Sequence, residues 1–115
     1  MEKTIKLAGR DYKLKASLGT IIKYREVFGS ELFGDVKLLD GLKDKSEEEV
    51  SKIIDVIFRI TYILHRPYTS KSYDEFLDEF DFSIISDVDS LQLLAKTIGE
   101  LLTPYKEGSK SPSNP

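Results

Sequence analysis

The feature that most constrains the fold is the long apolar run that follows Ser46. Ser46 and Glu49 have the spacing of a capping box, and the glutamates at 47–49 put negative charge where a helix dipole favours it. Pro67 disfavours helical geometry at the residue before it. The sequence therefore predicts a helix over residues 47–65.

The apolar residues of this helix cover an unusually wide arc. At 100° per residue they span roughly 220°, which is wider than the apolar stripe of an ordinary surface helix. The helix is therefore either the central helix of the domain or a helix that also meets another chain. The residues on this arc are Val50, Ile53, Ile54, Val56, Ile57, Phe58, Ile60, Ile63 and Leu64.

The first residues have the alternation of a β-hairpin. Ile5 and Leu7 flank a lysine, as do Tyr12 and Leu14, and this period of two is typical of strands with one buried face. Gly9 lies between the two runs and can adopt the positive φ of a tight turn. We expect a hairpin over residues 3–15, whose apolar face packs on the rest of the chain or on a neighbouring subunit.

Local signals predict further helices on both sides of the long one. Ser17 is a good N-cap and Gly29 suits the C′ position, which delimits a helix of about three turns. The stretch after it, up to Lys45, reads as one or two helical turns with weak boundaries, because Gly34 and Gly41 interrupt it.

Two more helices are predicted in the second half of the chain. Ser72 and Glu75 form a second capping box, which opens a short aromatic-rich helix followed by an acidic loop. The last helix is expected over about 86–103 and to end at Pro104. Residues 106–115 are rich in Ser, Pro, Gly and Lys, and we expect a disordered tail there.

These elements define the expected fold class. It is α+β and mainly α, with an N-terminal β-hairpin followed by a bundle of about four to five helices. The 115 residues suit one domain, which we place at residues 1–105, with the hairpin at 3–15 and the helices within 17–103.

Composition excludes several classes of function. The net charge of −3 comes from interleaved acidic and basic residues, so the basic patch that nucleic acid requires is missing. The chain has no cysteine, which rules out disulfides and thiolate chemistry. No secretory h-region or membrane-spanning run is present. We therefore expect a cytoplasmic protein that binds neither nucleic acid nor membrane.

The polar residues do not form a recognisable catalytic or metal-binding motif. His65 is the only histidine, and its place in the last turn of a helix has a structural explanation. The acidic residues between Asp74 and Asp89 lack the calcium-loop spacing, and a solvated acidic face explains them better. No glycine-rich phosphate loop or nucleophile motif occurs. The sequence predicts no cofactor, no metal, no small-molecule substrate and no enzymatic activity.

Apolar residues are more numerous than one small core requires. Plain exposure of some of them is one interpretation, because much of every protein surface is apolar, and a binding surface is the other; both stay open. The binding surface would bury an amphipathic helix of a partner in a groove. The candidate protein-binding residues are Tyr24, Val27, Phe28, Val56, Ile60 and Ile63.

The order of these elements resembles a known family. The hairpin with "KASL", the helix that closes on "YREVFG", the long apolar helix and the later "YDEFL" are similar to tail assembly chaperones of long-tailed phages and prophages of Gram-positive hosts. The resemblance covers roughly residues 3–103. It implies a non-enzymatic helical protein of the host bacterial cytoplasm. Such a protein binds the tape measure protein, and possibly the tail tube protein, and self-associates into a homo-oligomer.

Two other functions stay open at this stage. A head-tail connector or other tail subunit could use the same apolar surface to build a permanent ring. A small regulatory protein-binding module could instead bind a host protein through the acidic face, with an affinity that falls steeply with salt. An enzyme whose site is shared between subunits is a further alternative.

Overall fold

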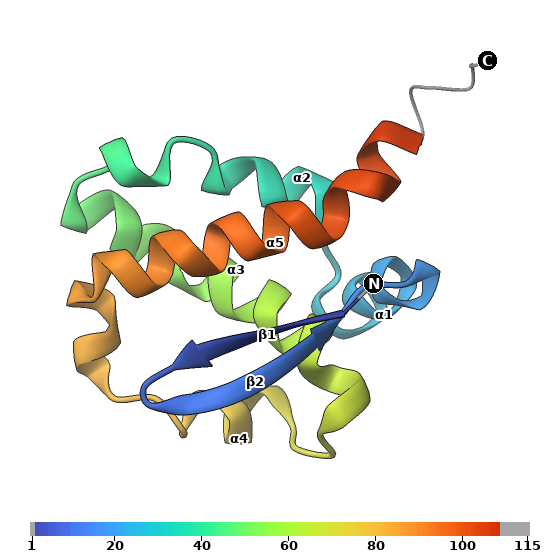
Figure 1. Cartoon of the computed structure of the whole chain (residues 1–115), viewed down its shortest axis with the longest axis horizontal. Coiled ribbons are helices and arrows are strands. Elements are labelled where there is room, and N and C mark those ends of the chain that lie inside the picture. Colours follow the sequence, from blue (N-terminus) through green and yellow to red (C-terminus); the bar gives the residue numbers. More distant parts are fainter. Residues whose placement is uncertain (1, 109–115) are drawn as a thin grey trace.

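The computed structural model describes residues 2–108, and within this range the chain is mainly helical with one β-hairpin (Figure 1). This confirms the predicted fold class. Four short 3-10 helices, η1 (Lys37–Leu39), η2 (Leu42–Asp44), η3 (Arg66–Tyr68) and η4 (Phe82–Ser86), connect the main elements. The main elements are β1 (Glu2–Leu7), β2 (Arg10–Lys15), α1 (Leu18–Phe28), α2 (Leu32–Val36), α3 (Glu47–His65), α4 (Tyr73–Leu77) and α5 (Val88–Gly108).

The two strands form the predicted antiparallel hairpin, with Ile5 opposite Tyr12 and Leu7 opposite Arg10. The turn consists of Ala8 and Gly9, which have φ values of 52° and 78°. Positive φ at both positions is what a two-residue type I′ turn requires, and it matches the twist of the strands. The alternation of the strands thus places one set of side chains, Ile5, Leu7, Tyr12 and Leu14, in the core.

Helix α3 is the central element of the fold, which is one of the two roles that its wide apolar arc allowed. Strand β2 packs on it, and so do α1, α2, α4, η4 and α5. In Figure 1, α5 runs beside α3, and the hairpin crosses in front of α3 below α5; β2 contacts α3 and β1 contacts α5. Because neighbours cover α3 on several sides, most of its apolar arc is used inside the domain.

The helix starts follow from local hydrogen bonds that the sequence indicated. Ser46 and Glu49 form the predicted capping box at the start of α3, with Glu49 N donating to Ser46 Oγ at 3.2 Å. Ser72 and Glu75 form the same arrangement at α4. Gly29 ends α1 in the left-handed conformation with a φ of 70°, as a C′ glycine does.

The C-terminal end of α5 differs from the prediction. The helix does not stop before Pro104 but continues to Gly108, so residues 106–108 are helical rather than disordered. A proline inside a helix removes the hydrogen bond to the carbonyl four residues earlier, and its ring crowds that carbonyl, but its fixed φ is itself helical, so a helix can continue past it with a local distortion. The rest of the predicted disordered tail, residues 109–115, lies outside the described residues.

Candidate functional site

The structure divides the six residues of the predicted binding surface into buried and exposed groups. Tyr24, Ile60 and Ile63 are buried, while Phe28 and Val56 are partly buried. Val27 alone is well exposed, with 45% of its surface open to solvent. Three of the six residues are therefore core residues of this chain, and the six do not lie together on one exposed surface.

The reason lies in how α1 and α2 pack on α3. Both helices cover α3, and Ile63 shares a hollow with Ser17 and Thr20 at the start of α1. The flank of α3 that seemed available for a partner is thus the contact surface of the chain's own helices. An aspartate at Ile60 or Ile63 would place a charge in the core and test only folding.

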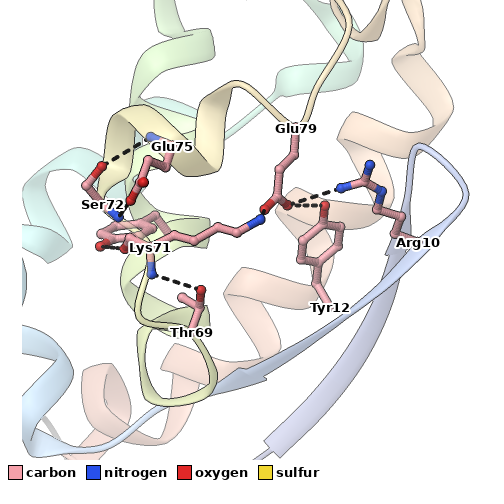
Figure 2. Close-up of polar contacts among 8 residues, drawn as sticks. Arg10, Tyr12, Thr69, Lys71, Ser72, Glu75 and Glu79 are labelled. Carbon is pink, nitrogen blue, oxygen red and sulfur yellow. Dashed lines mark hydrogen bonds and ion pairs between the residues drawn. The ribbon is translucent and has the colours of Figure 1, made fainter.

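A polar cluster ties the hairpin to the segment around α4, and Figure 2 shows its members. Glu79 is at its centre, and its side chain is only 13% exposed. The Tyr12 hydroxyl donates to Glu79 Oε1 at 2.7 Å, Lys71 Nζ donates to Oε2, and Arg10 Nη1 lies 3.6 Å from Oε1. One carboxylate thus connects β2, the loop before α4 and the residues after it.

The cluster shifts the pKa values of its own members. Burial alone would raise the pKa of the Glu79 carboxyl group, but the hydrogen bonds from Lys71 and Tyr12 and the nearby cations hold it below its usual range. Burial, together with the hydrogen bond to Glu79 and its charge, raises the pKa of Tyr12 to about 12. The cluster therefore consists of a charged carboxylate and a neutral phenol across the ordinary pH range.

A second cluster joins α1, α3 and α4 through aromatic rings. The Phe28 ring lies 5.1 Å from the Tyr24 ring and 5.0 Å from the Tyr73 ring, centroid to centroid. The guanidinium of Arg59 lies 5.3 Å above the Phe28 ring, and its Nε is 2.8 Å from Asp55 Oδ2 without the alignment of a hydrogen bond. This packing explains why Tyr24 and Phe28 are not free to bind a partner.

The tyrosine hydroxyl groups of this second cluster are satisfied by carboxylates. Tyr24 donates to Asp35 Oδ2 at 2.7 Å, and Tyr73 donates to Asp55 Oδ1 at 2.6 Å. Burial first, and then these carboxylates, raise the pKa of both phenols well above the usual value. Both tyrosines therefore stay neutral and act as structural donors.

His65 has the structural role that its position indicated. Its Nδ1 lies 2.8 Å from the carbonyl oxygen of Lys13, and since a carbonyl only accepts, Nδ1 carries the proton. The ring also lies 5.2 Å from the ring of Tyr12, edge to face. His65 thus fastens the end of α3 to β2. No group of three or more metal-ligating side chains occurs among residues 2–108.

An apolar hollow lies between α3, α4 and η4. This groove has a volume of about 150 Å³, and Phe82 at its edge has 86% of its surface exposed. Aspartate 81 is its one charged lining residue; the others are Ile54, Phe58, Leu77, Phe80, Phe82, Ile84 and Ile85. We call it the η4 groove.

Sequence reasoning missed this groove because it treated the residues between the short helix, which ends near residue 80, and the last helix, expected from about residue 86, as an acidic loop. The signal was present in "FSII", three apolar residues placed between aspartates, which a purely solvated loop does not need. Part of the lining, Ile54 and Phe58, belongs to the predicted apolar arc of α3. The structure thus moves the candidate surface from the α1 side of α3 to its α4 side.

We also compared the chain with known proteins and looked for helices that could cross a membrane. No family model, curated protein or solved structure matches this chain. No helix among the described residues combines the length and the apolar character that crossing a membrane requires.

Proposed function

We propose that this chain is a tail assembly chaperone of a phage or prophage, a non-enzymatic protein that binds the tape measure protein and keeps it soluble in the host bacterial cytoplasm. The sequence resemblance of the hairpin, "YREVFG" and "YDEFL" segments supports this function. The observation that carries it is the η4 groove, an open apolar surface next to an exposed phenylalanine.

Energetics favour a binding role for this surface. The Phe82 ring is 86% exposed and therefore contributes little to the stability of the fold. Burial of such a side chain by a partner would contribute on the order of 1.5 to 3 kcal/mol to the free energy of binding. An apolar groove also suits the helix-in-groove mode, in which side chains one turn apart enter the hollow. A long tape measure protein exposes many such amphipathic helices, so a shallow groove of this kind can bind it at several places.

Self-association is part of the same proposal. Leu18 and Ile22 are one helical turn apart on α1 and both are exposed, which gives α1 a separate apolar surface. In Figure 1, α1 lies toward the end of the molecule opposite η4, the light-orange turn before α5. A contact through α1 would leave the η4 groove open for the client.

Co-expression tests the proposed function. The tape measure protein of the same phage genome is expressed with and without this chain, and the soluble fraction is measured by centrifugation and immunoblotting. We expect the soluble fraction to rise and the two proteins to co-purify. An unchanged soluble fraction contradicts the proposal.

Size-exclusion chromatography separates the proposal from the connector alternative. A chaperone that releases its client is expected to form a small oligomer that dissociates on dilution. A connector subunit is expected to form a ring of fixed size at every concentration.

A further inference from the structure

A second hollow adjoins the η4 groove and has two carboxylates among its lining residues. It has a volume of about 120 Å³ and is lined by Ala8, Asp81, Ser83, Ile84 and Asp87. Asp81 and Ile84 also line the groove, so the two hollows share a wall. An apolar surface and a surface with two carboxylates therefore meet along the same turn.

The two carboxylates of this hollow are charged but not paired with a cation. Asp81 Oδ1 accepts from the backbone N–H of Ser83 at 2.8 Å, and Asp87 Oδ1 accepts from that of Ser90 at 3.2 Å. Neither residue forms an ion pair within the described range 2–108. Glu79, in contrast, is already neutralised by Lys71 and Arg10.

The surrounding sequence strengthens this negative field. Between Ser72 and Ala95 there is no lysine or arginine, although seven acidic residues occur. These are Asp74, Glu75, Asp78, Glu79, Asp81, Asp87 and Asp89. Segment 72–95 therefore contributes no cation of its own next to these two carboxylates.

We infer that the η4 groove and its carboxylate hollow together bind an amphipathic helix that carries lysine or arginine next to its apolar anchors. The apolar side chains enter the groove beside Phe82, and the cation enters the hollow between Asp81 and Asp87. Side chains three or four residues apart on a helix are roughly 5 to 6 Å apart, so neighbouring turns of one helix can supply both groups. This inference rests on the proposed function, because it specifies which helices of the tape measure protein the chaperone selects.

The test measures binding of fluorescent helical peptides by anisotropy. The first peptide has leucines at i, i+3, i+4 and i+7 with lysines beside them, the second has glutamates for the lysines, and the third keeps the lysines but has serines for the leucines. We expect only the first peptide to bind, with an affinity that falls as salt rises because the charges are exposed. Equal binding of the first and second peptides, or of the first and third, overturns the inference.

Variants of the chain test whether the peptide binds in the η4 groove and its carboxylate hollow. Phe82→Ser and the double variant Asp81→Asn/Asp87→Asn are each expected to weaken binding of the first peptide roughly tenfold. Asparagine keeps an oxygen that can accept the two backbone hydrogen bonds, so the double variant should fold normally. The matched control is Leu18→Ser, which removes an exposed apolar side chain of α1 and should leave peptide affinity unchanged. Unchanged affinity in the Phe82→Ser variant overturns the inference.

The same variants separate this inference from the proposed function. If the wild-type and Phe82→Ser chains both solubilise the tape measure protein, the groove is not the client site although the function stands. If the wild-type chain does not solubilise it but binds the first peptide through Phe82, the function fails and the groove still binds basic amphipathic helices.

Discussion

Two regions of this molecule are built from the same residue types and differ in whether their groups have partners. In the clusters around Glu79 and Phe28, carboxylates accept hydrogen bonds from tyrosines and lie next to cations, and aromatic rings pack on one another. In the η4 segment, Phe82 is exposed, and Asp81 and Asp87 accept backbone hydrogen bonds but form no ion pair with any of the described residues.

The difference shows that aromatic and acidic residues alone do not identify a functional surface in this chain. The clusters join elements that are distant in sequence, so their contacts stabilise the fold and leave little to offer a partner. Within residues 2–108, Asp81 and Asp87 form no ion pair and Phe82 is exposed, so these three side chains are available for binding, whereas Ile84 of the same segment packs against the core. Four predictions test this contrast, in order of decreasing effect.

The largest difference in stability is expected between variants of two aromatic residues, one buried and one exposed. Tyr24→Ala removes a fully buried ring and its hydrogen bond to Asp35, and should lower the free energy of unfolding by about 3 to 5 kcal/mol. Phe82→Ala removes an exposed ring and should change the free energy of unfolding by less than about 0.5 kcal/mol. Urea denaturation measures both. Similar losses in the two variants would contradict the contrast.

A smaller loss of stability is expected when the charge of one carboxylate, that of Glu79, is removed. Glu79→Gln keeps the shape of the side chain but removes the charge that Lys71 and Arg10 face, and should cost about 1 to 3 kcal/mol of stability. The control is Glu26→Gln, which affects an exposed pair with Lys23 and should cost less than about 0.5 kcal/mol. Equal denaturation midpoints for the two variants would show that Glu79 does not hold the hairpin.

The pH dependence of stability should reflect the shifted pKa values of the same cluster. The pKa of Glu79 is lowered in the fold, so its contribution is present above the usual 4.5 and is lost as pH falls through the lower value. The pKa of Tyr12 is raised, so its contribution is present below 10.0 and is lost as pH rises toward about 12.

The variant Tyr12→Phe isolates the alkaline part of this dependence. It should cost about 1 kcal/mol at neutral pH through the lost hydrogen bond and should make the alkaline loss of stability shallower. The variant should still lose some stability at alkaline pH, because the pKa values of Tyr24 and Tyr73 are also raised in the fold. Denaturation midpoints across pH measure the effect, and parallel alkaline curves for variant and wild type would contradict it.

The smallest effect concerns the apolar surface itself. A dye that fluoresces on apolar surfaces should bind less to Phe82→Ser than to the wild type, because that ring borders the η4 groove. Tyr73→Phe removes only a hydroxyl that already has Asp55 as its partner, so dye binding should stay the same. A decrease in Tyr73→Phe alone would place the exposed apolar surface elsewhere.

Local features of the fold could be predicted because their causes are local. The capping boxes at Ser46 and Ser72, the glycine stop at Gly29 and the strand alternation each depend on residues within a few positions. Pro104 was misjudged because its effect depends on how much helix surrounds it, and α5 continues across it.

The candidate site could be predicted only in part, because burial depends on which element covers which. The wide arc of α3 correctly predicted many contacts, but the arc alone does not say that α1 covers Ile63 while Phe58 borders an open groove. Phe82 lies outside every helical stripe, in a short 3-10 turn. Periodicity, the main sequence signal for apolar surfaces, does not apply to such a turn.

The packing of β1 against α5 has a consequence for synthesis of the chain. Lys3 Nζ lies 3.3 Å from Glu100 Oε1, so the first strand and the last helix are neighbours in the fold. The hairpin leaves the ribosome before α5 does, so the apolar surfaces of β1 and α3 that α5 covers stay open in the nascent chain until α5 has emerged. Ribosome-arrested chains should therefore resist protease only after α5 has emerged; earlier resistance would contradict this order.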